Sequence, residues 1–189
     1  MGFLDAVLGR KKLAAAKGDK LFALSTARIT LEAELGLKSA GAAAICFKPL
    51  SAGGFVRAEN ELSELLDIAV QTSGSRVRRR SDEFGFEWVI VEDQDFEDLV
   101  TTVHLVGSEL IARGFGEQLL ASLFRFDGGP HPVYWIYGYK RGAFWPFVPT
   151  GKDQERDNAE ELELKAKLER ELPIEPDLSR WLALFDAPI

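Results

Sequence analysis

The sequence predicts an α+β protein in which a mainly antiparallel sheet is packed by amphipathic helices. Two segments, 57–74 and 93–114, repeat apolar residues at helical spacing. Three strand-like runs then follow one another between residues 116 and 149 with only short turns between them, which favours an antiparallel sheet over a doubly wound parallel one. The 189 residues, 46% of them apolar, suit one core domain with appendages.

Residues 1–20 stand apart from the predicted domain. On a helix, an apolar stripe is followed by a cluster of cations: Phe3, Leu4, Val7 and Leu8, then Arg10, Lys11 and Lys12. The run "KKLAAAKGDK" has no periodic apolar face and indicates a linker. Ala6 stands where a myristoylation signal needs Ser or Thr, so a lipid anchor is unsupported. We predict that the stripe and the cations contact either an anionic membrane surface, a protein partner, or the domain itself.

Residues 21–150 form the predicted α+β domain. Its first segment favours a helix that Ser25 or Thr26 caps and Gly36 ends. The apolar run "AGAAAICFKPL" is typical of a buried strand closed by Pro49. The segment 57–74 is predicted to be an amphipathic helix with an apolar face formed by Leu62, Leu65, Leu66 and Val70.

The sequence from residue 76 to residue 114, in the middle of this domain, predicts two strands followed by the main core helix. In "RVRRR", alternation puts Arg76, Arg78 and Arg80 on one face, which indicates either a solvated, edge-protecting strand or an anion site. The run "FEWVIV" alternates apolar side chains on both faces and is expected in the interior of the sheet. The following helix starts with acids, which its dipole favours, and should stop at Gly114.

The aromatic run "YWIYGYKRGAFWPF" occupies the last two strands of the predicted meander. About half of its rings must face the core, and the others are covered by the C-terminal helices, form a partner surface, or line a small-ligand pocket. Residues 151–189 are predicted to be a charged helical extension packed on the domain. Leu164, Leu168 and Leu172 form its stripe, Pro173 ends the helix, and Asp177 begins a short last helix with Trp181.

The charge and the reactive side chains exclude several function classes. The net charge of −7 argues against general nucleic-acid binding, which needs a basic face. Cys46, His104 and the acids of "VEDQDFED" are the only candidate parts of an enzyme or cation site, and no local pattern places a base beside the thiol or completes an EF-hand loop. We therefore predict no catalytic, cofactor or metal site. Without a signal peptide or an apolar run of about 20 residues, the chain is expected in the cytoplasm.

Four segments carry a resemblance to a known family: "MGFLDAVLGR", "LFALSTARITLEAELGLKSAGAAAICFKPL", "GFEWVIVEDQDFEDLVTTVHLV" and "YWIYGYKRGAFWPFVP". In order and spacing they resemble PspAB, the small PspA-associated proteins of actinobacteria, over essentially the whole chain. The resemblance implies an accessory of the phage-shock envelope-stress system, whose central member PspA protects damaged inner membrane, and it supplies no catalytic motif. The order of helix, hairpin and long helix is also similar to YbjN and type III secretion chaperone-like domains.

Together these observations predict a non-enzymatic adaptor. It would bind a protein partner, PspA or an associated protein, near the cytoplasmic face of the inner membrane, with weak anionic membrane contact through residues 1–12. The alternative is a small-molecule sensor or an enzyme that uses the aromatic strand region and His104.

Overall fold

Six strands form a single sheet in the computed structural model, which describes residues 18–51, 53–151 and 154–189. The strands are β1 (Lys38–Phe47), β2 (Arg76–Ser81), β3 (Glu87–Glu92), β4 (Leu119–Asp127), β5 (Val133–Gly138) and β6 (Ala143–Phe147). Their order across the sheet is β2-β3-β1-β4-β5-β6, and every neighbouring pair is antiparallel. This arrangement confirms the predicted α+β class and the interior position of the strand that contains "EWVIV".

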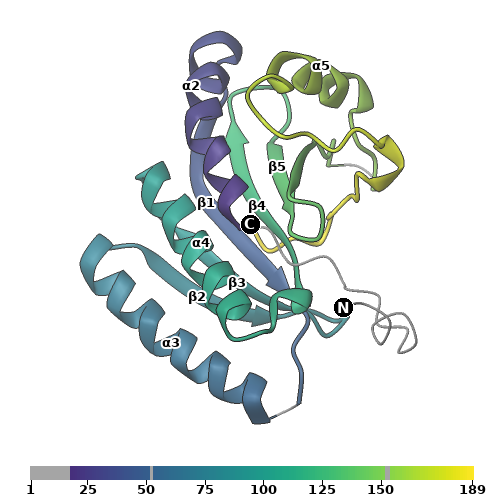
Figure 1. Cartoon of the computed structure of the whole chain (residues 1–189). Coiled ribbons are helices and arrows are strands. Elements are labelled where there is room, and N and C mark those ends of the chain that lie inside the picture. The colour runs from purple at the N-terminus through teal and green to yellow at the C-terminus, as the bar shows by residue number, and fades with distance from the viewer. Residues whose placement is uncertain (1–17, 52, 152–153) are drawn as a thin grey trace, which may run out of the picture.

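Four α-helices and three single 3₁₀ turns accompany the sheet in the described ranges. The helices are α2 (Ala23–Leu35), α3 (Gly53–Ser73), α4 (Phe96–Ala112) and α5 (Asn158–Leu168), and the turns are η1 (Asp19–Phe22), η2 (Gly116–Gln118) and η3 (Leu178–Arg180). Figure 1 shows α2, α3 and α4 side by side in front of the strands, with α5 beside β5.

Capping residues mark both ends of α4 and the end of α2. The Asp95 carboxylate accepts a hydrogen bond from the Glu97 N–H at 2.8 Å, and Gly114, with φ +84°, reverses the chain after α4 as predicted. Gly36, with φ +67°, ends α2. The predicted start of α2 at Ser25 or Thr26 is wrong, because η1 runs directly into the helix and both residues lie inside it.

The helices bury one face of the sheet. Leu24 of α2, Phe55 and Leu62 of α3, and Val103 of α4 are buried against side chains such as Val89 of β3. Of the predicted apolar face of α3, Leu62 and Leu66 are buried, whereas the side chains of Leu65 and Val70 lie outside what the structure describes. The alternating apolar residues of β3 thus supply this face of the sheet through Val89 and Val91.

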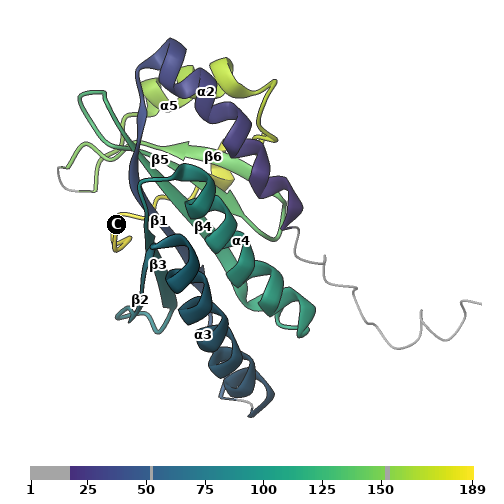
Figure 2. The same cartoon turned by 90° about the vertical axis from the view of Figure 1, so that its left-hand side faces the viewer.

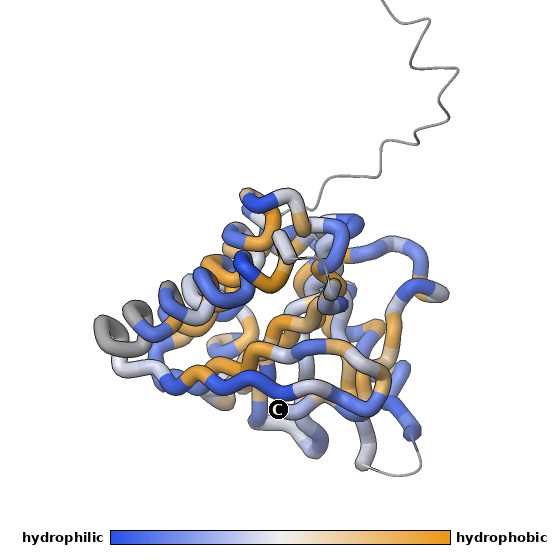
Figure 3. Tube along the Cα trace, turned by 90° about the horizontal axis from the view of Figure 1, so that it is seen from below, coloured by the Kyte–Doolittle hydropathy of each residue, from blue (hydrophilic) through white to orange (hydrophobic). Residues whose placement is uncertain are grey.

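The opposite face of the sheet is equally apolar, and no helix covers it among the described residues. It presents Cys46, Trp88, Ile90, Ile136 and Trp145, all buried, together with Ala44, Leu123 and Phe147. The C-terminal segment, defined here as residues 174–189, lies across it through Ile174, Ala183, Leu184, Phe185, Ala187 and Ile189. Figure 2 shows the C-terminus on the side of the strands away from α3 and α4, and Figure 3 shows apolar residues along the strands between these two layers.

Main-chain hydrogen bonds attach the C-terminal segment to the edge of β6. The Phe144 N–H donates to the Pro173 carbonyl at 2.8 Å, and the Glu175 N–H donates to the Phe144 carbonyl at 2.9 Å, so residue 174 makes a parallel bridge with Phe144. Side-chain hydrogen bonds hold the remainder of the C-terminal segment. Trp181 Nε1 donates to the Glu175 carbonyl, Trp145 Nε1 donates to the Leu182 carbonyl, and the Tyr134 hydroxyl donates to the Ile189 carbonyl. This edge of the sheet is therefore occupied by the chain itself.

A buried ion pair joins the segment, α5 and β6. Arg156 Nε donates to both oxygens of the Glu161 carboxylate at 2.8 and 3.0 Å, and Glu161 is only 2% exposed. The Glu161 carboxylate also accepts the Val148 N–H at 2.9 Å, while Arg156 Nη1 donates to the Trp181 carbonyl at 2.9 Å. The guanidinium lies 5.3 Å from the centre of the Phe147 ring. One arginine thus connects three elements.

The C-terminal helices are shorter than predicted. Helix α5 stops at Leu168, yet Leu164, Leu168 and Leu172 are all buried in the core on the helix side of the sheet. Asp177 does begin a helical turn, accepting from the Ser179 N–H, but this turn ends at Arg180. The chain beyond it extends over the sheet, where its apolar side chains are buried without a helix. The predicted division of the chain at residues 20 and 150 stays a prediction.

Replacing Gly107 with alanine should destabilise the fold. A Cβ at this position of α4 would lie 2.9 Å from the Tyr139 hydroxyl, which is fully buried and hydrogen-bonded to Ser122 at 2.9 Å. We expect Gly107→Ala to lower the free energy of unfolding by about 1–3 kcal/mol in chemical denaturation, as overpacking does. Gly54→Ala in α3 is the control, because its Cβ would meet only ordinary contacts at 3.6 Å or more. Equal stability of the two variants would contradict the close packing of α4 against Tyr139, which follows β5.

Replacing Arg156 with methionine should cost more than replacing an exposed arginine. Arg156→Met leaves the Glu161 carboxylate buried without its cation, and we expect a loss of about 3–5 kcal/mol in the free energy of unfolding. Arg125→Met removes a half-exposed pair with Asp127 and should cost less than about 1 kcal/mol. Urea titrations of both variants measure the difference. A small effect at Arg156 would mean that Glu161 is solvated.

Candidate functional site

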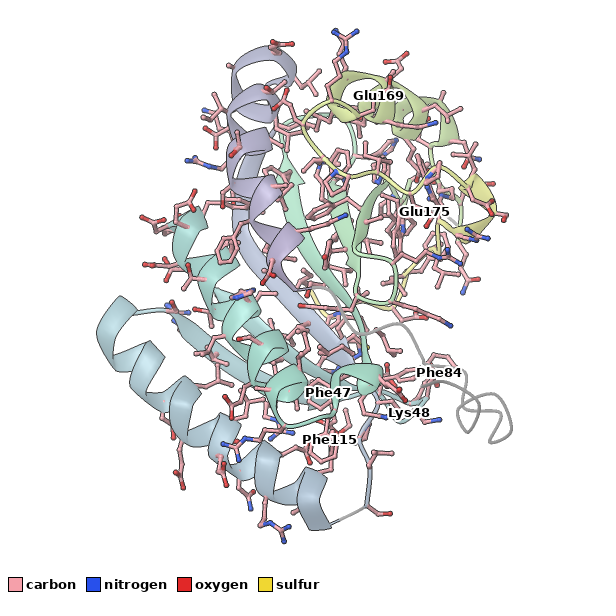
Figure 4. All side chains as sticks on the ribbon, in the orientation of Figure 1. Phe47, Lys48, Phe84, Phe115, Glu169 and Glu175 are labelled. Atoms are coloured by element: carbon pink, nitrogen blue, oxygen red, sulfur yellow. The ribbon has the colours of Figure 1, made fainter. Side chains whose placement is uncertain are left out.

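A large pocket opens on the sheet face that the C-terminal segment covers only in part. Its volume is about 970 Å³. Cys46, Trp88, Ala121 and Trp145 contribute to its walls from the strands. The turn between β2 and β3, η2, the turn between β5 and β6, and residues 179–187 complete the lining. Figure 4 labels Phe84 and Glu175, which border the pocket from the β2–β3 turn and from the C-terminal segment.

Large apolar side chains around this pocket remain in contact with water. Phe84 is 66% exposed, Leu182 62% and Leu120 40%, and all three line the pocket. They come from three separate parts of the chain: the β2–β3 turn, the C-terminal segment and β4. Single exposed apolar residues are ordinary, but a group of them around a concave apolar floor marks a binding surface.

Asp82 lies at the pocket with its carboxylate fully engaged. One oxygen accepts the Phe84 and Phe86 N–H groups, each at 2.9 Å, and the other accepts Trp88 Nε1 at 2.8 Å. Burial alone raises the pKa of this carboxyl group, but the indole and the backbone N–H donors outweigh it and lower the pKa below its ordinary value. Asp82 is therefore an ionised residue that shapes the β2–β3 turn.

Cys46 and His104 lie on opposite sides of the sheet. Burial, and secondarily the charge of Asp82, raises the pKa of the Cys46 thiol to about 12, so the thiol is protonated at neutral pH. His104 belongs to α4, where its half-buried ring packs against Phe22 with centroids 4.7 Å apart. The structure thus separates the two residues that an enzymatic interpretation would combine.

Glu175 organises the basic part of the pocket. Its carboxylate is only 3% exposed and lies 3.4 Å from Arg141 Nε and 3.5 Å from Arg180 Nη1. It also accepts the Asp177 N–H at 3.1 Å. Arg180 also contacts Asp177 at 3.0 Å, so two acids face the two arginines, and Glu175 connects the β5–β6 turn to the C-terminal segment.

The remaining predicted candidates have structural roles. Register pairs Arg76, Arg78 and Arg80 with Glu92, Ile90 and Trp88 on the edge strand β2, and Arg76 and Arg78 contact Glu92 at 3.8 and 3.2 Å. These contacts favour the solvated edge strand over the anion site. Of the acids before α4, Asp93 accepts the Asp95 N–H at 2.8 Å. Within the described ranges, no group of three or more His, Cys, Asp or Glu residues could hold a metal ion.

The predicted membrane or partner residues lie outside the described residues. They are Phe3, Leu4, Val7, Leu8, Arg10, Lys11 and Lys12. Among residues 18–51, 53–151 and 154–189, no helix is both long and apolar enough to cross a membrane.

The pocket itself was not located from the sequence, although one of the three roles left open for the aromatic run was a ligand pocket. Trp145 and Gly138 of that run do line it, but Asp82, Phe84, Leu120 and Phe185 come from elsewhere. The sequence feature that could have indicated this second covered face was "FEWVIV". A strand with two apolar faces needs a covering layer on each side of the sheet.

Comparisons with known proteins give one result. A family model described as PspAB, PspA associated protein B, matches residues 1–189. Searches of curated proteins and of solved structures found no match. The predicted likeness in fold to YbjN and type III secretion chaperone-like domains therefore stays a prediction.

Alkaline pH should destabilise the protein. Burial raises the pKa of Cys46 from 9.0 and of Tyr137 from 10.0, each to about 12. The unfolded chain loses these protons first, so the stabilisation is complete below about pH 9 and falls as the pH rises towards 12. We expect denaturation midpoints to be constant from pH 7 to 9 and to decrease above it. In Cys46→Ala the decrease should begin nearer pH 10, and a flat profile from pH 9 to 11 would contradict the burial of these groups.

Proposed function

The chain belongs to the PspAB family, and from this membership and the pocket we propose that it is a non-enzymatic adaptor of the PspA envelope-stress response. It binds a protein partner, PspA or a protein associated with it, near the cytoplasmic face of the inner membrane. The family description supports the association with PspA. The pocket supports binding through an apolar side chain of the partner that inserts into it.

The observation that carries the proposal is the exposed apolar rim of the pocket. Phe84 and Leu182 are each more than 60% exposed beside a buried aromatic floor. A partner that inserts an apolar side chain between them removes this surface from water at about 25 cal/mol per Å². Aromatic side chains in partly preformed pockets are the residues that dominate binding at protein interfaces.

The ionisable groups of the pocket support a role without catalysis. The Cys46 thiol is held protonated, and the Asp82 carboxylate is ionised and accepts hydrogen bonds from the main chain and from Trp88. Glu175 is paired with Arg141 and Arg180. Burial and, secondarily, the nearby charge of Asp82 raise the pKa of the Cys46 thiol, and this effect opposes formation of a nucleophilic thiolate.

Residues 1–12 supply the second contact of the adaptor. Half insertion of Phe3, Leu4, Val7 and Leu8 at a membrane surface contributes about 4 kcal/mol, and the three cations add about 1 kcal/mol each on an anionic leaflet. Ordering two helical turns of the segment costs about 1–2 kcal/mol per residue, which offsets this gain. Attachment to the membrane therefore depends on a partner that is already there.

A second candidate function is a small-molecule sensor, and the pocket volume favours it. About 970 Å³ lies within the range of roughly 300–1,000 Å³ found for ligand pockets. The sensor predicted from the sequence uses the aromatic strand region and His104. The pocket contains Trp145 and Gly138 of those strands, but His104 lies on the other side of the sheet.

Co-sedimentation with anionic vesicles tests the adaptor. We expect the intact protein to sediment weakly alone and strongly when purified PspA is present. Phe84→Glu places a charge in the pocket rim and should abolish the PspA-dependent part. Ile29→Glu is the matched control, because Ile29 is 64% exposed on α2 and lies on the helix side of the sheet.

The possible outcomes separate the two functions. Loss of PspA-dependent recruitment in Phe84→Glu, with recruitment kept in Ile29→Glu, supports the adaptor. If PspA recruits neither the intact protein nor the control, the adaptor proposal is wrong for PspA. If PspA recruits all three proteins equally, the pocket is not the partner surface, and a ligand role for it becomes the better explanation.

A further inference from the structure

Several acidic residues at the rim of the pocket form no ion pair with any described residue. Arg141 and Arg180 both contact Glu175, and Arg180 also contacts Asp177, so two acids balance these two arginines. Asp82, Glu117 and Asp186 also line the pocket and form no ion pair within the described part of the chain, and Lys140 is the one lining cation in the same situation. The rim therefore favours an occupant that is apolar at its centre and positively charged beside it.

Residues 3–12 have this composition, and they end six residues before Gly18, the first described residue. Residues 3–8 carry Phe3, Leu4, Val7 and Leu8 at helical spacing, and Arg10, Lys11 and Lys12 follow directly. An amphipathic helix that places its apolar face in an apolar groove is a common mode of peptide recognition. The three cations then complement Glu117 and Asp186, whose carboxylates make no hydrogen bond or ion pair within the described residues, while the charged Asp82 carboxylate already accepts three hydrogen bonds.

The segment has enough chain to reach the pocket. A Cβ on Gly18 would lie 3.6 Å from Ile111 Cδ1, so residue 18 packs on the last turn of α4. Five residues later Gly116 lines the pocket, which puts Gly18 within about 25 Å of it. The ten Cα–Cα steps from Leu8 to Gly18 span about 33 Å when extended, and the cations at 10–12 lie on this path, between the pocket and Gly18.

We propose that residues 3–8 of the chain dock in this pocket, with the cations at 10–12 over its acidic rim. The tether gives the segment a high effective concentration at the pocket, which compensates for its weak intrinsic affinity. The docked segment would be hidden from the membrane, and a partner that takes the pocket would release it. The inference goes beyond the adaptor proposal and does not depend on PspA.

Disulfide trapping in the full chain tests the docking. Cys46, the only cysteine, is first replaced by alanine. Leu4→Cys is then paired with Leu120→Cys in the pocket wall, or with Ile29→Cys on α2 as the control. Ile29 is eleven residues beyond Gly18 in mostly helical chain, within about 17 Å of it, so the tether reaches both positions. Oxidation is followed by non-reducing gels and mass spectrometry at low protein concentration, without PspA or vesicles.

We expect the intramolecular 4–120 disulfide to form several-fold faster than the 4–29 disulfide. Reversing the charges with Arg10→Glu, Lys11→Glu and Lys12→Glu should remove most of this difference. Equal rates for the two pairs would overturn the proposal. Disulfides found only between molecules would also overturn it, because the occupant would then be a second copy. Since PspA is absent, failure here leaves the co-sedimentation result to decide the adaptor separately.

Discussion

The fold depends on the need to cover a sheet that is apolar on both faces. Strand β3 shows this in six residues, since Val89 and Val91 face one layer while Trp88 and Ile90 face the other. Helices α2, α3 and α4, together with α5, cover the first face. The second face relies on the C-terminal segment, which lacks the regular hydrogen bonds of a helix or a long strand and is instead held by individual groups. Arg156, Glu175 and the indoles of Trp145 and Trp181 supply those contacts. The polar network at this end of the molecule is therefore a condition for burying the second face.

The pocket follows from this mode of covering. A helix laid on the sheet would have filled the face evenly, whereas an irregular segment covers β5 and β6 and leaves a hollow towards the turns. Exposed apolar side chains from three parts of the chain border the hollow, so it differs from an ordinary surface in polarity. Binding at this place, by a partner or by the chain itself, would complete a layer that the fold leaves unfinished.

The sequence predicted local structure well and long-range assembly poorly. Strands were found where apolar residues alternate, as in β3, and helices end at Gly36 and Gly114 because glycine adopts the conformation that ends them. The leucines at 164 and 168 indicated a buried helix correctly, but the irregular course after Arg180 was missed, since its side chains are fixed by contacts with Trp145 and Phe147 far back in the chain. The pocket was missed for the same reason. Cys46, Phe84 and Leu184 become neighbours only through sheet topology, which a single sequence does not reveal.

The parallel bridge between Phe144 and Ile174 also bears on how the protein is made. Ribosomes add residues from the N-terminus, so all six strands leave the exit tunnel before the segment that covers their second face. During that interval a nascent sheet displays Trp88, Ile90 and Ile136 to the cytosol of whichever cell produces it. Such a surface is a target for chaperones and a hazard for aggregation. Emergence of residues 174–189 from the tunnel, which allows this segment to fold back onto the strands, is thus the event that covers the exposed face.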